Sequence, residues 1–351
     1  MSRDLATSPP TLAPAGHTME NPMKTTLLRL AAAFAISAVP ASVLAQDGST
    51  ITVYTSQPTE QMTAVIEAFN VDHPEITVEL FRSGTTEVMS KLQAEVAAGQ
   101  VQADVILIAD AVAMTQLKNE GLLYAYTDAP VENLPASVVD PDMTFFGTKL
   151  ITTGIIYNTD LVDTPPTAWA DLTQPEIASG LIMPSPLYSG AAVIHVGTVV
   201  QQPEFGWEYY ETLADNGAVA GQGNGTVVEA VARGEKPYGI IIEYMALNAK
   251  KDGSPVDFVF PAEGVSSITQ PIAIFKDTDA LEAAKIFVDW QLSASAQEQS
   301  VTQGYFPIFA GVAVPEGYPE VDSLNILPAD FDQMLADDEA NKQHFADLFG
   351  G

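Results

Sequence analysis

The sequence predicts an α/β protein with two lobes joined by two extended segments. In both halves of the chain, short apolar runs typical of strands alternate with amphipathic helical segments, the pattern of helix-flanked, largely parallel sheets. Two long extended runs, 145–158 and 268–275, interrupt the alternation, and we interpret them as strands that cross between the lobes. The 306 residues (351 − 45) after position 45 are enough for two lobes.

A leader precedes the predicted lobes. Residues 1–22 are rich in Pro, Ser and Thr, and Met23 then opens the pattern of a secretory signal. Its apolar core, residues 30–39, is too short to span a bilayer permanently, and a small-residue cleavage site ends at Ala45. We expect residues 1–45 to be removed on export; whether Met1 or Met23 is the true start stays open.

The composition excludes several function classes. The chain has no cysteine, which excludes disulfides, thiolate metal sites, cysteine nucleophiles and a lipoprotein anchor. The formal net charge of −31 disfavours nucleic acids and anionic membranes as partners. The acidic residues are scattered rather than grouped in blocks, which indicates a solvated surface.

The first half contains three predicted strand–helix units. The strands cover 51–55, 76–81 and 103–108. The first helix ends at Phe69, the second is capped by Ser83 or Thr85 and runs to about Ala98, and the third begins at Asp110. A loop with three prolines follows at 127–142.

The second half repeats the pattern. Strands are predicted at 181–183, 217–220, 238–242 and 256–260. Helices are predicted from the Ser189 cap onward, at 205–214, from 221–226 to Ala232, at 279–293, at 294–303 and within 330–349. Tyr209 and Tyr210 lie in the amphipathic helix 205–214, and we interpret them as packing residues.

Four segments at strand ends share one design, which places hydroxyls, glycines and free backbone N–H groups at the start of a helix. Such helix starts attract anions, although every α/β unit also needs ordinary caps. Two lie in each half, so facing lobes would bring all four to one cleft. The candidate binding residues in them are Ser56, Gln57, Ser83, Gly84, Thr85, Thr86, Tyr188, Ser189, Gly190, Ala191, Asn224 and Thr226.

Catalytic and cofactor motifs are missing. The run 221–225 lacks the third glycine of a dinucleotide fingerprint, where Thr226 stands, and there is no G-x-S-x-G, Walker loop or H-E-x-x-H. Outside the leader, His73, His195 and His344 are isolated from one another. We expect neither a cofactor nor a resident metal, and an enzyme is the less favoured interpretation.

Several short motifs, in this order and spacing, resemble extracellular solute-binding proteins of ABC importers, in the ferric-iron-binding-like group. The resemblance covers about residues 48–310. The motifs are Ile51–Ser56, Ala103–Val105, Gly154–Asn158, Trp169–Thr173, Gly206–Tyr210, Ala230–Glu235 and Gly304–Pro307.

This resemblance implies a type II periplasmic binding protein, a monomeric periplasmic receptor that closes on a solute and delivers it to permease subunits. It implies that 46–147 plus 269–310 form lobe 1 and 148–268 form lobe 2. The lobe of the tail, 311–351, is left open.

The ligand class is also implied by the resemblance. Iron binders of this group carry two adjacent tyrosines where this chain has Glu243 and Tyr244, so only one position matches. Other members bind organophosphates or phosphonates, such as 2-aminoethylphosphonate or sugar phosphates, and share the Ser-Gly and Thr helix starts. In that interpretation Ser83, Thr85, Thr86, Ser189, Gly190 and Ala191 hold the phosphoryl oxygens, while Asp110, Glu243 or Tyr244 meets the rest of the solute. The alternatives are a ferric iron receptor and a secreted hydrolase or lyase on a similar scaffold.

Overall fold

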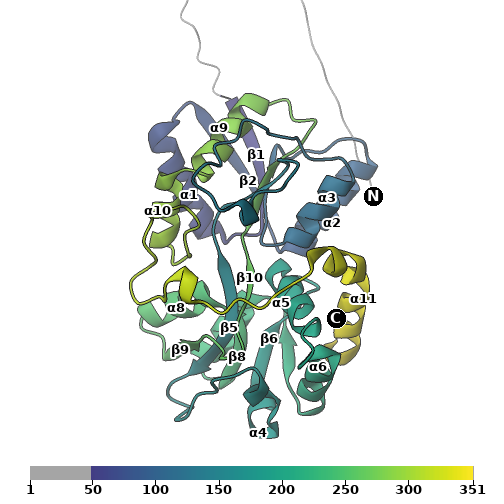
Figure 1. Ribbon diagram of the computed structural model, residues 1–351, viewed down its shortest axis with the longest axis vertical. Helices are drawn as coiled ribbons and strands as arrows, with labels where there is room; N and C mark the ends of the chain where they lie inside the picture. The colour runs from purple at the N-terminus through teal and green to yellow at the C-terminus, as the bar shows by residue number, and fades with distance from the viewer. Residues whose placement is uncertain (1–48, 351) are drawn as a thin grey trace, which may run out of the picture. The chain divides into compact units, whose positions relative to one another are not determined.

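Two separate β-sheets form the framework of residues 49–350, the part of the chain that the structure, a computed structural model, describes (Figure 1). The predicted leader, residues 1–45, lies outside the described residues. No helix within 49–350 is both long enough and apolar enough to cross a membrane. We use lobe 1 and lobe 2 for the residues packed around the first and the second sheet.

The first sheet has the strand order β2-β1-β3-β11-β4. β1 runs parallel to β2 and β3, whereas β11 is antiparallel to β3 and β4. The strands are β1 (Ser49–Thr55), β2 (Ile76–Arg82), β3 (Val105–Leu107), β4 (Phe146–Gly147) and β11 (Pro271–Ile274). The helices around it are α1 (Thr59–Asp72), α2 (Thr85–Ala97), α3 (Ala111–Asn119), α9 (Leu281–Gln291) and α10 (Ala294–Thr302). The parallel strands end at one edge, where α1, α2 and α3 begin.

The second sheet has the order β10-β5-β8-β6-β7, and β9 also pairs with β5. Its strands are β5 (Ile151–Asn158), β6 (Leu181–Pro184), β7 (Val219–Gly221), β8 (Tyr238–Ile242), β9 (Val256–Val259) and β10 (Ser266–Ile268). The helices in this part are α4 (Pro175–Ala178), α5 (Gly190–Val200), α6 (Gly206–Asp215), α7 (Asn224–Ala232) and α8 (Glu243–Lys251). Short 3₁₀ turns occur at Ala136–Val138, Ala170–Thr173 and Val321–Ser323.

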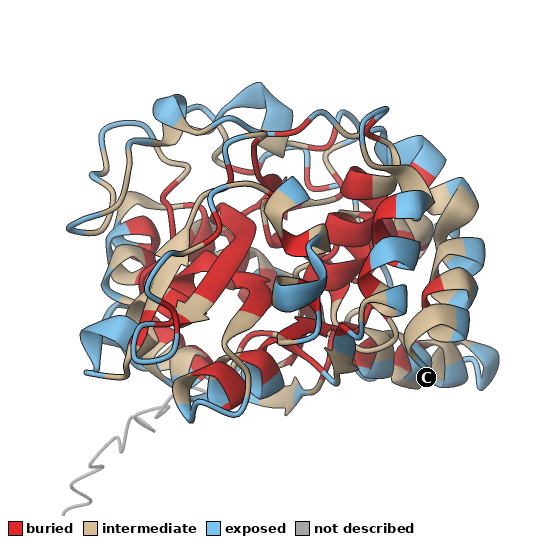
Figure 2. Cartoon of the chain, turned by 90° about the horizontal axis from the view of Figure 1, so that it is seen from below, coloured by how far each residue is buried: buried red, intermediate tan, exposed pale blue. Residues whose placement is uncertain are grey.

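The cores lie between the sheets and their helices, as the buried strands in Figure 2 show. In lobe 1, Phe69 of α1 packs edge-on against Phe287 and Trp290 of α9. In lobe 2, α5 is buried over nearly its whole length, because most of its residues are apolar and α6, α11 and β10 pack against it. Tyr209 and Tyr210 are buried among apolar residues, which confirms their predicted packing role.

The two crossing segments differ from the prediction, because neither run is one continuous strand. The run 145–158 divides into β4 and β5, which lie in different sheets. The run 268–275 starts at the last residue of β10, in the second sheet, and continues after residues 269–270 as β11 in the first sheet. Between them the chain leaves one sheet and enters the other: Thr148 and Lys149 both donate their backbone N–H to the carbonyl of Thr269. The predicted lobe boundaries, after 147 and after 268, fall at the ends of β4 and β10.

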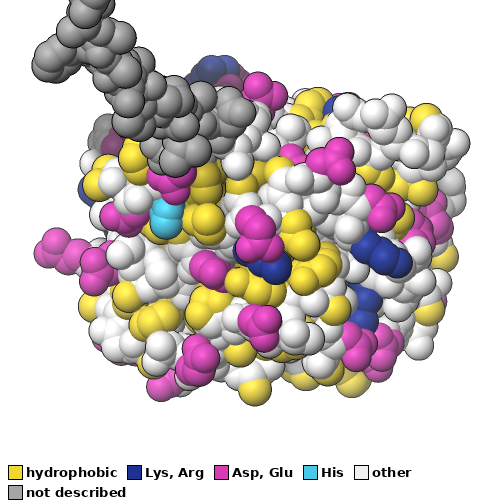
Figure 3. Space-filling model, turned by 90° about the horizontal axis from the view of Figure 1, so that it is seen from above, with side chains coloured by type: hydrophobic (Ala, Val, Ile, Leu, Met, Phe, Trp, Pro, Cys, Tyr) yellow, Lys and Arg dark blue, Asp and Glu magenta, His cyan; other side chains and the backbone are white. Residues whose placement is uncertain are grey.

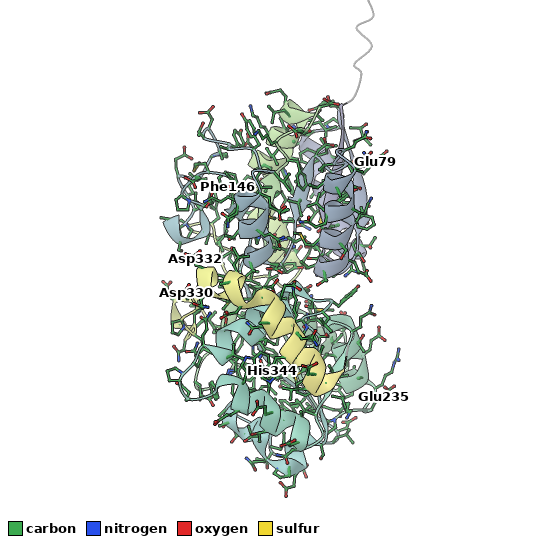
Figure 4. The ribbon with its side chains drawn as sticks, turned by 90° about the vertical axis from the view of Figure 1, so that its right-hand side faces the viewer. Glu79, Phe146, Glu235, Asp330, Asp332 and His344 are labelled. Carbon is green, nitrogen blue, oxygen red and sulfur yellow. The ribbon has the colours of Figure 1, made fainter. Side chains whose placement is uncertain are left out.

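The C-terminal tail ends in the predicted helix, α11 (Phe331–Phe349), whose N-cap Asp330 accepts a hydrogen bond from the Gln333 N–H. α11 packs on α5 and α6 of lobe 2 and also contacts α3 of lobe 1 (Figures 1 and 4). Phe345 is fully buried beside Tyr210, and Trp207 stacks on His344, which Figure 4 labels. The tail therefore touches both lobes, with its buried anchor in lobe 2.

Acidic side chains are scattered over the molecular face in Figure 3, with few lysines and arginines between them. This agrees with the predicted solvated surface. The negative charge is thus a general property of the surface, so an anion site in this protein must depend on local groups.

Candidate functional site

A cavity of about 450 Å³ lies where the helix-bearing edges of the two lobes meet. Its wall takes residues from both lobes, as the sequence predicted for the four strand-end segments. Eleven of the predicted site residues line it: Ser56, Gln57, Gly84, Thr85, Tyr188, Ser189, Gly190, Ala191, Asn224, Thr226 and Tyr244.

The first residues of four helices line this cavity: Thr59 of α1, Thr85 of α2, Gly190 of α5 and Asn224 of α7. The N-caps of α1, α2 and α7 are Pro58, Gly84 and Gly223, and none of them makes a side-chain capping hydrogen bond. The predicted capping of α2 by Ser83 or Thr85 is therefore wrong. The Thr86 N–H of α2 is bonded to the Tyr188 carbonyl, and the other uncapped N–H groups of these helix starts remain able to bind an acceptor on a ligand.

Ser189 and Asn224 are held in place by local hydrogen bonds. Ser189 caps α5, as predicted: its Oγ accepts from the Ala192 N–H. Asn224 donates its Nδ2 to that same Oγ at 3.1 Å and accepts from the Ile242 N–H. These contacts fix the starts of α5 and α7 relative to the end of β8, so their polar groups face the cavity in one arrangement.

Arg82 is a wall residue that the sequence analysis missed. Among residues 49–350 it is the only lysine or arginine that lines this cavity. Its guanidinium donates to the carbonyls of Gln57 and Ser56, each at 3.3 Å. Its position could have indicated a site residue, because Arg82 ends β2 and directly precedes the Ser83–Thr86 segment. An exposed arginine at a strand end is common, however, so this position alone is not specific.

The other missed wall residues include Tyr305 and Gln270, which are almost fully buried, and Glu229, the only carboxylate in the described wall. Glu229 is exposed and pairs with Arg233 at 3.3 Å. Tyr305 comes from the segment after α10, and its ring centroid lies 4.2 Å from that of Tyr244. Their positions depend on tertiary packing, which no local pattern reports.

Four predicted residues do not line the cavity. Asp110 is buried and caps α3 by accepting from the Ala113 N–H, and burial raises the pKa of its carboxyl to about 7. Glu243 is completely buried and accepts from the Thr152 N–H, with burial raising its pKa to about 8. Ser83 instead bonds the Glu87 carboxylate, and Thr86 donates its backbone N–H to the Tyr188 carbonyl.

The lobes touch directly beside the cavity through two glycines. A Cβ at Gly190 would lie 2.7 Å from the Ala109 carbonyl oxygen, and one at Gly84 would lie 2.5 Å from the Tyr188 ring. The Thr86 to Tyr188 backbone hydrogen bond, 3.4 Å long, crosses at the same place. The structure thus has the lobes closed around the cavity.

The inner wall is a buried polar cluster. The Oε1 of Gln57 accepts from Lys149 Nζ at 3.0 Å and from Gln270 Nε2 at 3.1 Å. Lys149 Nζ also lies 4.5 Å from the centroid of the Tyr305 ring. Because Lys149 and Gln270 belong to the two segments that join the sheets, Gln57 connects the cavity to the crossing segments.

A larger groove, about 940 Å³, lies over the crossing segments, between the 127–142 loop and the tail. Its lining is mostly apolar and includes four carboxylates, Glu132, Asp140, Glu320 and Asp322, with no lysine or arginine among the described residues. Such a lining disfavours an anion, so we place the candidate site in the smaller cavity.

Comparison with known proteins gives the family. The model of the bacterial extracellular solute-binding proteins matches residues 55–298. The chain belongs to this family. It is 28% identical over 282 residues to the probable ABC transporter periplasmic-binding protein y4fP of Sinorhizobium fredii, covering 76% of each chain.

Solved structures share the two-lobed type II fold. The periplasmic binding protein AfuA of Actinobacillus pleuropneumoniae, with exogenous fructose-6-phosphate bound, has a TM-score of 0.78 at 22% identity, covering 86% of this chain and 98% of that one. Iron-bound HitA of Pseudomonas aeruginosa has a TM-score of 0.74 at 20% identity, covering 85% and 99%. The predicted fold and family are thus confirmed, and the family consists of binding proteins rather than enzymes.

Proposed function

We propose that this protein is the periplasmic receptor of an ABC importer for a small solute carrying a phosphate or phosphonate group. Family membership supports the receptor role, and the y4fP relative supports the importer class. In this proposal lobe 1 comprises 46–147 plus 269–310, lobe 2 comprises 148–268, and cleavage near Ala45 releases a monomer that delivers the solute to the permease.

The proposal that the solute bears a phosphoryl group rests on one observation: four helix N-termini and Arg82 converge on one cavity. Each helix N-terminus contributes about 0.3–1 kcal/mol toward an anion, and up to about 2 in favourable partly buried geometry. The scattered surface carboxylates act from farther away and are screened over about 8 Å at physiological ionic strength. Local dipoles and one guanidinium therefore outweigh the overall negative charge.

Different parts of the cavity wall suit the phosphoryl group and the organic part of the ligand. Thr85, Ser189, Gly190 and Ala191, together with Arg82, surround the position proposed for the phosphoryl oxygens. The aromatic rings of Tyr188, Tyr244 and Tyr305 and the polar groups of α7 remain for the organic part. Since Asp110 and Glu243 are buried behind the wall, we assign the contact with a cationic or hydroxyl group to Glu229 and Tyr244 in their place.

A thermal-shift screen tests the proposal with fructose 6-phosphate, 2-aminoethylphosphonate, inorganic phosphate and ferric citrate. A ligand present at 100 times its dissociation constant stabilises the folded state by about 2.7 kcal/mol, so binding is easily detected. We expect stabilisation by at least one phosphorylated or phosphonate compound, which mass spectrometry recovers unchanged. Stabilisation by ferric citrate alone, or turnover of the bound compound, would contradict the proposal.

A further inference from the structure

Lys149 is a completely buried lysine in the segment between β4 and β5. Its Nζ contacts the Gln57 side-chain oxygen at 3.0 Å and the face of the Tyr305 ring at 4.5 Å. Within residues 49–350 no carboxylate lies within ion-pair distance of it. Buried lysines without a partner of opposite charge are rare, because removing an ammonium from water is costly.

The ammonium lies directly behind the cavity wall, since Gln57 and Tyr305 both line the cavity. The other charged or titratable groups around this cluster are Arg82, which donates to the Gln57 carbonyl, Tyr244, which packs on Tyr305, and Glu243. Burial raises the pKa of Glu243 to about 8, so that carboxyl is mostly uncharged at neutral pH. No neighbour therefore supplies the negative charge that Lys149 lacks.

We propose that the missing counter-charge of Lys149 is the bound anion, and that Lys149 acts through Gln57 as a positioning residue that takes up a proton when the solute enters. This inference rests on the proposed function. The amide of Gln57 is well suited to the role, because its Oε1 accepts from Lys149 while its chain is part of the wall. The backbone N–H of Lys149 donates to the Thr269 carbonyl, which places this residue where the chain crosses between the lobes.

Burial lowers the pKa of Lys149 to about 7, so the empty protein carries this proton only part of the time near neutral pH. An anion nearby favours the charged form and raises that pKa. When the solute binds above pH 7, each protein molecule should therefore take up a proton from solution, at most one. Affinity should fall as pH rises, by at most about tenfold per pH unit, because one proton is linked to one binding event.

The binding test is calorimetric titration with fructose 6-phosphate at about pH 7.5 and 8.5, in buffers of different ionisation enthalpy. A phosphate monoester with a second pKa near 6 is mostly dianionic there, so it contributes little proton exchange of its own. We expect proton uptake in the wild type, none in Lys149→Met, and about tenfold or greater weakening in that variant. Glu243→Gln is the matched control, because Glu243 titrates in the same range, and it should keep the uptake.

A second measurement needs no ligand. A buried charge without a counter-ion destabilises the folded protein, so Lys149→Met should unfold at a higher temperature than the wild type near pH 7. The difference should shrink toward pH 10, because the lysine of the unfolded wild type then also loses its proton and folding no longer requires deprotonation.

Wild-type binding without proton uptake, or unchanged affinity in Lys149→Met, overturns the inference while leaving the proposed function intact. If no phosphorylated probe binds, the proposed function fails. A less stable Lys149→Met would show that the ammonium already has a stabilising partner in the ligand-free protein, which contradicts the missing counter-charge.

Discussion

The α-carbon of Gly190 faces the carbonyl oxygen of Ala109 so closely that a Cβ at position 190 would lie 2.7 Å from that oxygen. Gly190 is the first residue of α5 in lobe 2, and Ala109 directly precedes the cap of α3 in lobe 1. The obstructing atom belongs to the backbone, which cannot move aside as a flexible side chain does. This pair of residues therefore sets how closely the lobes approach beside the cavity.

Gly190→Ala should hinder closure. We expect the wild type to contract when it binds fructose 6-phosphate, because rotation of the lobes closes the cavity, as in other hinged binding proteins. The variant should contract less and bind about tenfold or more weakly. Small-angle scattering with and without the sugar phosphate measures the radius of gyration.

Gly225→Ala is the control, because it lies in the same wall but an added Cβ there meets nothing within 4 Å. Equal contraction in both variants would show that Gly190 does not limit closure.

Two neighbouring threonines give a matched comparison at the start of α2. Thr85 lines the cavity and is buried, whereas Thr86 does not line it. Thr85→Val keeps the side-chain shape but removes a hydroxyl, which should cost about 1–3 kcal/mol of binding if a buried phosphoryl oxygen loses its partner. Thr86→Val should bind like the wild type. Calorimetric titration decides between them, and a larger loss in Thr86→Val would move the phosphoryl group away from the wall position assigned here.

The charge of Arg82 gives a third comparison. Arg82→Gln removes the only cation of the described wall, and hydrogen bonds to charged groups are worth about 1.5–3 kcal/mol. Because Arg82 is exposed, we expect a loss near the lower end, together with weaker salt dependence of binding. The control is Lys276→Gln, an exposed cation that does not line the cavity. Unchanged affinity in Arg82→Gln would mean that the helix N-termini alone hold the anion.

Iron binding should be absent. Tyr244 and Tyr305 are adjacent in the wall, but burial raises the pKa of Tyr244 to about 12 and that of Tyr305 well above its usual value. Phenolates are therefore costly to form, and no group of three or more His, Cys, Asp or Glu side chains in the described chain is placed to bind a metal. We expect a colourless protein with ferric citrate, and a visible tyrosinate-to-iron band at one iron per protein would contradict this.

The alternation of strands and helices could be predicted from the sequence because it depends on local apolar runs and on caps such as Ser189. The division of 145–158 between two sheets could not. Residues 148–150 look as extended as their neighbours, and the break depends on long-range pairing with Thr269. In the site, the helix starts were predictable for the same local reason. Tyr305 was not, because it reaches Tyr244 from 61 positions further along the chain through tertiary packing.

Glu243 leads to a prediction about stability and pH. Its pKa in the folded protein is about 8, raised by burial from 4.5, so between these values the folded state binds more protons than the unfolded state. The stability that this group contributes is fully present below about pH 4.5 and is lost as pH rises through about 8. Lys149 acts in the opposite direction above pH 7, because its pKa is lowered, so the wild-type curve alone does not isolate Glu243.

The difference between wild type and Glu243→Gln does isolate it. The free energy of unfolding of the wild type, relative to that of Glu243→Gln, should fall by a few kcal/mol between about pH 5 and 9, since one pKa unit corresponds to about 1.4 kcal/mol. His195, whose pKa is lowered to about 3 by burial, loses its contribution only below about pH 6.5 and cancels in the comparison, because both proteins contain it. Denaturant unfolding at several pH values measures the difference. A difference that does not change with pH would mean that Glu243 titrates alike in the folded and unfolded states, and that its buried carboxyl is charged near neutral pH.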